Sequence, residues 1–179
     1  IYKYNSKEKT KTKSTMGKNT EIADIFERIA DALEFKGEMV FKVSAYRKAA
    51  RMLREYSGDI SSIHPSEIEG IGKGMAEKIE EYLKTGRIKK YEEVIADIPE
   101  GLLELLNIPN MGPKTLHLLH KELGVNNLKD LERVLEEGKV AALPGMGEKK
   151  EENIKKGVLL YKAGRSRIPL ATALKVVRE

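Results

Sequence analysis

The sequence predicts an all-α protein built as two small helical domains. Apolar residues recur at three- and four-residue steps along most of the chain, which is the period of an amphipathic helix. No segment alternates apolar and polar residues over the length of a strand. Glycines stand at the ends of several apolar segments, where they can close one helix or open the turn to the next.

The first helix is predicted from residue 20 onward, with Asn19 or Thr20 as the N-cap and Gly37 as the stop. A second helix is predicted over roughly residues 44–57. Arginines lie along the edge of its apolar side, and no acidic residue stands among them. This stripe either contacts phosphates or is a solvated face; it consists of Arg47, Arg51 and Arg54. Further helices are predicted over residues 74–85, 88–96, 99–107, 113–123, 128–137, 147–163 and 169–179.

The composition excludes several classes of protein. Apolar residues make up 40% of the chain and charged residues 34%, which is typical of a soluble globular protein. No apolar stretch is long enough to span a membrane. Because the chain has no cysteine, it has no disulfides, thiolate zinc sites or thiol nucleophiles. We expect a monomer in the cytoplasm, associated with the nucleoid.

The net charge of +5 comes from the first residues alone. Residues 1–20 hold six lysines and one glutamate, whereas residues 21–179 hold 27 basic and 27 acidic residues. Residues 1–18 are predicted to form a flexible basic arm, which either scans DNA or is an extension upstream of a start at Met16. A nucleic-acid function of the folded part must therefore rest on local geometry.

Three stretches resemble one another, and each joins a short helical segment to an amphipathic helix through a glycine-containing turn. They are IEGIGKGMAEKIEEYLKTG (68–86), IPNMGPKTLHLLHKELG (108–124) and LPGMGEKKEENIKKG (143–157). Short helices are predicted before the turns, over residues 65–68, 101–107 and 139–143. The turns centre on Gly72, Gly112 and Gly147, and glycine is predicted to close the following helices at Gly86, Gly124 and Gly157.

Such a turn can cradle a phosphate. Glycine permits a positive φ and leaves no Cβ to obstruct a close approach. The first N–H groups of the following helix lack intrahelical acceptors and lie at the positive end of the helix dipole. Such contacts do not touch the bases, so binding should be non-specific in sequence and salt-dependent. The residues predicted to bind DNA are Gly70, Gly72, Lys73, Gly74, Gly112, Lys114, Thr115, Gly145, Gly147 and Lys149, with Arg47, Arg51 and Lys90 outside the turns.

The order and spacing of these motifs resemble the family X DNA polymerases. FKVSAYRKAARMLREYSGDI and EIEGIGKGMAEKIEEYLKTGRIKKYEEV are similar to their amino-terminal lyase-type domain. LLNIPNMGPKTLHLLHKELGVNNLKDLERVL and LPGMGEKKEENIKKGVLLY are similar to their DNA-binding fingers region, and RIPLATALKVVRE to the entry to the palm. The resemblance implies gap-filling repair on gapped, nicked or primer-template DNA. It implies a lyase-type domain over 19–97, a fingers-type domain over 98–164 and the start of a palm over 165–179.

The resemblance also implies a 5′-deoxyribose phosphate lyase, in which a lysine forms a Schiff base with C1′. The matching lysine is Lys78, with Tyr46 lining the site. The surrounding cations that could contact phosphate are Lys42, Arg47, Lys48 and Lys90. Neighbouring cations would favour the neutral amine that nucleophilic attack requires. However, Gly74 stands where an animal member of the family has an assisting lysine, and Lys78 is alternatively a surface lysine paired with Glu81.

Two kinds of metal ion follow from the resemblance. Hairpin carbonyls in the family hold a monovalent cation, so Na⁺ or K⁺ is expected at the carbonyls of Ser66, Ile68, Ile71, Leu106, Ile108 and Met111. In the second hairpin, Asn110 replaces a glycine, although asparagine tolerates left-handed backbone geometry. Nucleotidyl transfer needs paired carboxylates, and the five aspartates include no D-x-D pair. Mg²⁺ is therefore expected only in a palm domain that this chain lacks.

Two other interpretations stay open at this point. The chain could be a stand-alone, non-enzymatic DNA-binding adaptor, which would bind DNA without covalent chemistry. It could also be a helical scaffold for protein–protein contacts, although that role leaves the three glycine turns unexplained.

Overall fold

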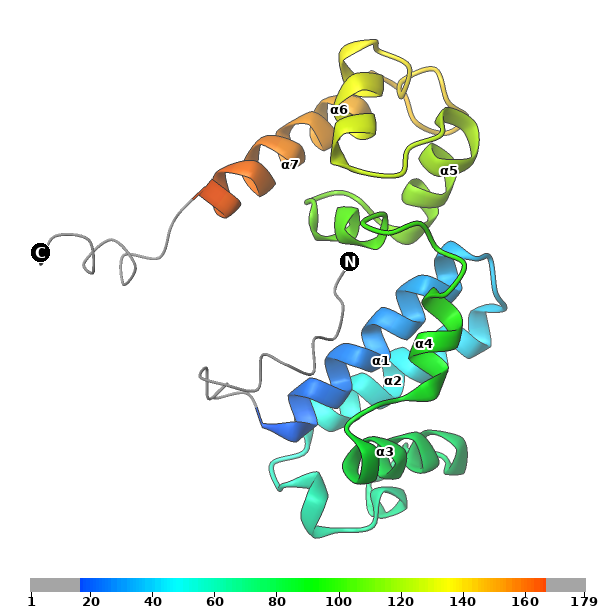
Figure 1. Ribbon diagram of the computed structural model, residues 1–179, viewed down its shortest axis with the longest axis vertical. Helices are drawn as coiled ribbons and strands as arrows, with labels where there is room; N and C mark the ends of the chain where they lie inside the picture. The colour runs from blue at the N-terminus through cyan, green and yellow to red at the C-terminus, as the bar shows by residue number, and fades with distance from the viewer. Residues whose placement is uncertain (1–16, 167–179) are drawn as a thin grey trace, which may run out of the picture. The chain divides into compact units, whose positions relative to one another are not determined.

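The computed structural model describes residues 17–166, and within that range the chain folds entirely into helices and loops (Figure 1). It divides into two compact units with the boundary between Ile98 and Pro99. Residues 1–16 of the predicted arm, the predicted helix over 169–179 and the expected palm segment beyond residue 166 lie outside the described range. The last two residues of the predicted arm are instead the N-cap, Gly17, and the first residue, Lys18, of a helix. None of the helices in residues 17–166 has the length and apolar content needed to cross a membrane.

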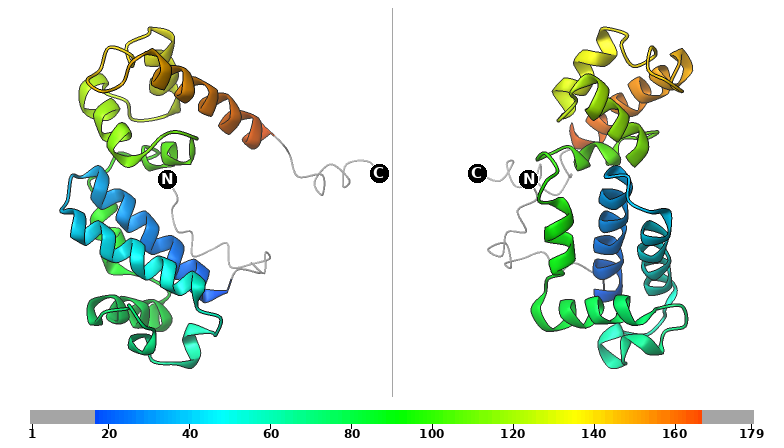
Figure 2. Two further views of the ribbon diagram at one scale, coloured as in Figure 1. Left: turned by 180° about the vertical axis from the view of Figure 1, so that it is seen from behind. Right: turned by 90° about the vertical axis from the view of Figure 1, so that its right-hand side faces the viewer.

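The first unit is built on a hairpin of two long helices, α1 (Lys18–Phe35) and α2 (Val40–Glu55). The short helix α4 (Lys89–Ile95) packs against α1, and α3 (Lys73–Thr85) runs across one end of the hairpin (Figure 2). Two 3₁₀ turns, η1 (Ile60–Ser62) and η2 (Pro65–Glu67), lead from α2 to α3. In the core, the rings of Phe26 and Tyr46 meet edge to face, with centroids 5.5 Å apart.

Helix α2 begins four residues earlier than predicted. Its first turn contains exposed apolar side chains: Val40 is 75% and Phe41 67% exposed, and Met39 before them is 62% exposed. The apolar period that marks the buried side begins only at Val43 and Tyr46. The sequence pattern could therefore not locate the helix start.

Asn19 does not cap α1, contrary to the prediction. The N-cap is Gly17, and it makes no side-chain hydrogen bond. The Asn19 side chain instead holds the loop after α2: Nδ2 donates to the carbonyls of Tyr56 (3.3 Å) and Gly58 (2.7 Å), and Oδ1 accepts from the N–H of Ile60 (3.0 Å). Asn19 can do so because it lies inside the first turn of α1 and faces residues about 40 positions later.

The second unit contains a 3₁₀ segment, η3 (Leu103–Asn107), and three helices, α5 (Pro113–Leu123), α6 (Leu128–Glu136) and α7 (Glu148–Ser166). The segment before the second hairpin is thus a 3₁₀ turn rather than the predicted helix over 99–107. Residues 139–143 form only turns, so the third repeat lacks its predicted first helix. The unit's core is apolar and includes Leu102, Leu105, Ile108, Leu116, Leu119, Val125, Leu131, Val140 and Ile154.

A buried carboxylate fixes the loop that stands in place of this missing helix. Glu151 on α7 is 7% exposed, and its Oε2 accepts a hydrogen bond from the Ala141 N–H at 2.7 Å. Its Oε1 accepts from Lys155 Nζ, also at 2.7 Å. The Lys155 ammonium, followed by the Ala141 N–H, lowers the pKa of Glu151. The loop before the third hairpin is therefore tied to α7 by an ionised side chain.

Glycine closes two of the three repeat helices as predicted, since Gly86 (φ 71°) and Gly124 (φ 66°) are left-handed C-caps. The third prediction is wrong, because α7 continues through Gly157 to Ser166. Gly157 instead allows a close approach, because a Cβ there would overlap the Pro109 carbonyl oxygen. The absence of a side chain at Gly157 sets how closely α7 packs on the second hairpin.

We expect Gly157→Ala to destabilise the protein by about 1–3 kcal/mol, because the added methyl group meets backbone atoms that cannot move aside freely. Urea denaturation followed by circular dichroism would measure the decrease in the free energy of unfolding. Gly164→Ala in the same helix is the matched control, since a Cβ there meets nothing within 4 Å. Equal stability of the two variants would contradict the close contact.

Candidate nucleic-acid interface

One backbone hydrogen bond closes the turn in each of the three hairpins. In each case an N–H donates to the carbonyl three positions earlier. The bonds run from Ile71 to Ile68 (3.1 Å), from Met111 to Ile108 (3.0 Å) and from Met146 to Leu143 (3.0 Å). The Ile71 and Met111 side chains are each 6% exposed and anchor their turns in the apolar core. The turn residues on either side of these anchors are thereby held at the surface.

A positive φ occurs at the first residue of each turn, namely Gly70 (87°), Asn110 (68°) and Gly145 (73°). The tolerance of Asn110 for left-handed geometry is thus confirmed. Gly72 and Gly112 differ from the expectation, because they are extended N-caps with φ of −77° and −100°. These glycines matter because they have no side chain. A Cβ on either would meet nothing within 4 Å, so the space beside the helix N-terminus is open.

The first two hairpins present backbone N–H groups that no described residue accepts. The first backbone hydrogen bond of α3 runs from the Met75 N–H to the Gly72 carbonyl. In α5 it runs from the Leu116 N–H to the Gly112 carbonyl. Pro113 occupies the first position of α5 and has no N–H to satisfy. The N–H groups without an acceptor in residues 17–166 include those of Gly70, Gly72, Lys73 and Gly74, and of Gly112, Lys114 and Thr115. We call the turn and the first helical residues of each hairpin its corner: residues 70–74 in the first hairpin and 110–115 in the second. Each corner is therefore suited to bind an anion.

Lysines flank these corners without acidic partners. Lys73 in the first hairpin and Lys114 in the second are exposed, and neither makes an ion pair with another described residue. The same holds for Lys149 in the third. Their charge adds to the positive end of the helix dipole at the same place.

The third hairpin differs from the other two. Gly147 has a φ of 81°, and its N–H donates to the Ala141 carbonyl at 3.1 Å. The Lys150 ammonium donates to the Gly145 carbonyl at 2.6 Å. Asn110 Nδ2 also donates to the Asn153 carbonyl of α7 at 3.4 Å, which joins this hairpin's helix to the second hairpin. The third hairpin thus offers fewer free groups and supports its neighbour.

The arginine stripe on α2 does have acidic partners, which corrects the expectation from the sequence. Arg54 pairs with Asp24 (2.8 Å) and Glu27 (3.1 Å) of α1. Arg47 pairs with Asp31 (3.2 Å) and Glu34 (2.5 Å), also of α1. Arg51 lies 4.0 Å from Glu55 of its own helix. The partners of Arg47 and Arg54 come from a different helix, so inspection of α2 alone could not reveal them.

Residues from three helices meet around Lys78. Lys78 is half-buried on α3, and its Nζ lies 3.0 Å from the Gly74 carbonyl and 5.9 Å from the centroid of the Tyr46 ring. Burial, and then the charge of Glu93, raises the pKa of Tyr46 to about 12, so the phenol stays protonated at neutral pH. Glu81 accepts the Lys89 N–H rather than pairing with Lys78. Lys78 and Tyr46 therefore lie next to each other.

Three of the four cations expected around Lys78 are paired with carboxylates, namely Lys42, Lys90 and Arg47. Lys42 Nζ lies 2.8 Å from Glu38, and Lys90 Nζ lies 3.4 Å from Glu93. The charges of Lys42 and, less strongly, Lys90 lower the pKa of Glu38. Carboxylates thus offset the positive charge of both lysines.

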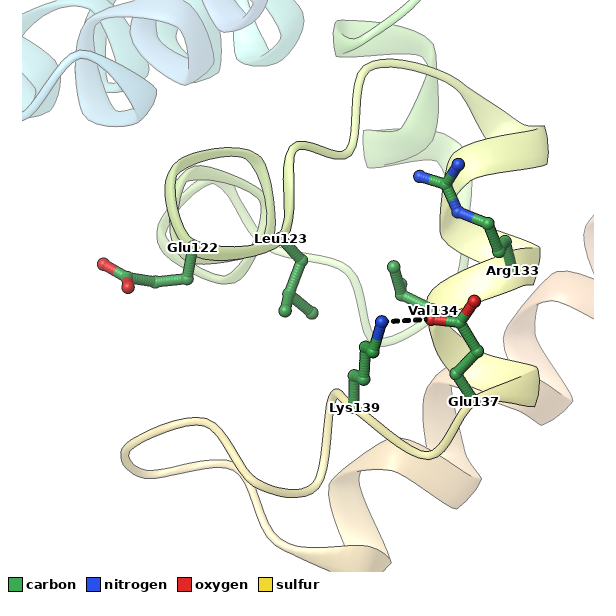
Figure 3. A pocket seen from close by; sticks show the side chains of 6 residues that line it. All are labelled: Glu122, Leu123, Arg133, Val134, Glu137 and Lys139. Atoms are coloured by element: carbon green, nitrogen blue, oxygen red, sulfur yellow. Dashed lines mark ion pairs between the residues drawn. The ribbon is translucent and has the colours of Figure 1, made fainter.

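Other polar features of the described residues offer no competing site. Figure 3 shows a shallow hollow of about 480 Å³ lined by Glu122, Leu123, Arg133, Val134, Glu137 and Lys139. Its cations are occupied, since Lys139 pairs with Glu137 (2.6 Å) and Arg133 with Asp130 (3.5 Å). His64 caps η2, and its Nε2 lies 2.9 Å from Glu80. No group of three potential metal-binding side chains occurs among residues 17–166.

Comparison with known proteins covers both units. A profile described as a helix-hairpin-helix domain matches residues 17–88, and one described as a SAM-like helix-hairpin-helix tandem matches residues 102–158. The chain is 39% identical over 162 residues to the DNA polymerase/3′-5′ exonuclease PolX of Bacillus subtilis (strain 168), which covers 89% of this chain and 28% of that protein. It is 30% identical over 115 residues to DNA polymerase lambda of Rattus norvegicus, which covers 63% of this chain and 19% of that protein.

Agreement over both units, in order, decides the family. The chain carries the amino-terminal helix-hairpin-helix region of a family X DNA polymerase. It spans less than a third of the length of either relative. In this family X region, the tandem profile includes the second and third hairpins together, in agreement with their direct contacts.

The hairpin carbonyls of the family X region fit a monovalent cation chemically. The carbonyls of Ile68 and Ile108 each accept one turn hydrogen bond and keep a second lone pair. The other expected carbonyls accept no hydrogen bond from a described residue; they belong to Ser66, Ile71, Leu106 and Met111. Neutral oxygen donors of this kind suit a hard alkali ion.

Proposed function

We propose that this chain binds gapped or nicked DNA through the sugar-phosphate backbone, as the DNA-holding part of a gap-filling repair polymerase. The observation that carries the proposal is the pair of exposed corners, at Gly72 and Gly112, whose backbone N–H groups have no acceptor among the described residues. The two relatives are both named as DNA polymerases, which supports DNA as the partner. The sequence has no D-x-D pair of aspartates, so the proposal for this chain is DNA binding and does not include nucleotidyl transfer.

The charge distribution favours contact at the corners over a broad electrostatic surface. The residues after position 20 carry no net charge, and two of the three α2 arginines are paired with α1 carboxylates. A phosphate at a corner meets several N–H donors, the helix dipole and a nearby lysine. Since none of these groups reaches a base edge, we propose binding that is independent of sequence and weakened by salt.

A lyase activity is the second candidate function, and the position of Lys78 against Tyr46 favours it. The neutral Lys78 amine would add to the C1′ aldehyde of an open-chain deoxyribose phosphate. Loss of water would then form an imine, and elimination would release the 3′ phosphate. The Gly74 carbonyl accepts a hydrogen bond from Lys78 Nζ and orients it.

We further propose that Na⁺ or K⁺ binds the carbonyls of the first and second hairpins and bridges them to phosphate. Such an ion would place positive charge beside the free N–H groups without any charged side chain. The support is the set of hairpin carbonyl oxygens that accept no hydrogen bond from a described residue.

Valine at a corner should block phosphate and leave the fold intact. For Gly72→Val and Gly112→Val, φ is already acceptable to valine and no atom lies within 4 Å of the new Cβ. Loss of hydrogen bonds to a charged group predicts roughly a tenfold or greater fall in affinity for gapped DNA, measured by fluorescence anisotropy. Gly17→Val at the start of α1, where no hairpin exists, is the control. Unchanged affinity in both hairpin variants would refute the proposal.

Exchange of the salt cation tests the ion site. At constant ionic strength, replacement of K⁺ by tetramethylammonium should lower DNA affinity several-fold, because carbonyl oxygens cannot coordinate so bulky a cation. The Gly72→Val/Gly112→Val double variant, which lacks the proposed hairpin contacts, should show no such difference. Equal affinity of the unmodified protein in both salts would count against the ion.

Borohydride trapping tests the lyase. With DNA carrying a 5′-deoxyribose phosphate, the unmodified protein should form a reduced covalent adduct, visible as a shifted band on a denaturing gel. Lys78→Ala should abolish the adduct, whereas Lys84→Ala on the same helix should retain it. An adduct that persists in Lys78→Ala would assign the chemistry to another amine, and no adduct at all would leave DNA binding as the function.

A further inference from the structure

The first hairpin is covered on one side by a lysine that comes from a different helix. Lys48 and Met52 lie one turn apart on α2 and both reach Gly70. A Cβ on Gly70 would lie 3.1 Å from Lys48 Cε, 3.3 Å from Met52 Sδ and 3.5 Å from Lys48 Nζ. The Lys48 side chain can take this position because residue 70 has no side chain.

Lys48 differs from its neighbours in having no acidic partner. Arg47 and Arg54 each contact two carboxylates of α1, while Lys48 is exposed and makes no ion pair or hydrogen bond with another residue of the range 17–166. It also lines a shallow groove of about 680 Å³ along α2, together with Arg51 and with the carboxylates Glu27 and Glu55. An unpaired ammonium group therefore stands where this groove meets the first hairpin.

The distances suit one phosphate shared between this ammonium and the hairpin backbone. Standard backbone dimensions place a Cβ about 2.5 Å from its own amide nitrogen, so Lys48 Nζ lies within about 6 Å of the Gly70 nitrogen. Hydrogen bonds from an ammonium to a phosphate oxygen are about 2.8 Å long. Two oxygens of one phosphate can therefore reach both donors, and the Gly70 N–H has no acceptor among the described residues.

We infer that Lys48 is a phosphate-binding residue of the first hairpin and holds one DNA phosphate together with the Gly70 N–H. The inference rests on the proposed function and identifies a contact within it. It makes the first hairpin a site formed by two elements, α2 and the turn. In the second hairpin, by contrast, the nearby lysine is Lys114 of the turn helix itself. It also gives Gly70 a second requirement besides its positive φ, since a side chain there would displace Lys48.

The test measures DNA affinity of the full chain at several KCl concentrations, with a gapped duplex as the probe. Lys48→Gln should lower affinity at low salt by roughly three- to tenfold. The slope of log K against log [KCl] should become shallower by about 0.9, which is the change expected for the removal of one phosphate interaction. Lys84→Gln is the matched control, because it removes the same charge from an exposed lysine of the same unit that is already paired with Glu80. Its slope should not change. Circular dichroism checks that both variants fold.

The outcomes separate the inference from the proposed function. If the unmodified protein shows no salt-dependent DNA binding, the proposed function and the inference both fail. If it binds, and Lys48→Gln matches Lys84→Gln in affinity and slope, only the inference is overturned and the hairpin amides remain the contact. A shallower slope in Lys48→Gln alone supports the shared phosphate.

Discussion

In the first two hairpins, the backbone hydrogen bond across the turn and the buried apolar residue inside it determine which groups the hairpin can offer to a ligand. Ile71 and Met111 are drawn into the core, and their N–H groups are satisfied within the turn. The flanking glycines and the first helical residues must then lie outside, where their N–H groups face solvent. The packing that buries the Ile71 and Met111 side chains therefore also keeps the N–H donors of the corners exposed.

The ion pairs between α1 and α2 are the reason why we propose phosphate contacts at the corners and not along the α2 arginines. Arginines are the usual means of holding phosphate, yet Arg47 and Arg54 are each held by two carboxylates across the helix hairpin. These pairs are partly exposed, so their effect on stability is modest. Their larger effect is to remove free positive charge from this helix edge, leaving the hairpin lysines and Lys48 as the local excess.

The sequence predicts what depends on local pattern and misses what depends on partners distant in the chain. Apolar period and glycine position predict nearly every helix and the C-caps at Gly86 and Gly124, whereas the grouping of Lys78 with Tyr46 follows only from the resemblance to the family. The pattern places Gly157 wrongly at a helix end, because a glycine at close packing and a glycine at a cap look the same in one dimension. The carboxylates of α1 recur at helical spacing and so form an acidic stripe. Comparison of this stripe with the α2 arginines could have predicted the ion pairs between the two helices.

The clamp formed by Asn19 has a chemical consequence for the loop between α2 and the first hairpin. Both amide hydrogens and the amide oxygen of this side chain are engaged, with two carbonyls and one N–H of the loop. Spontaneous deamidation would replace the donor nitrogen by an oxygen that can only accept. A carboxylate would then face the carbonyls of Tyr56 and Gly58, and the repulsion would release the loop. Deamidation of this one side chain would thus loosen the loop that leads to the first hairpin, while every residue of the hairpin itself would remain unchanged.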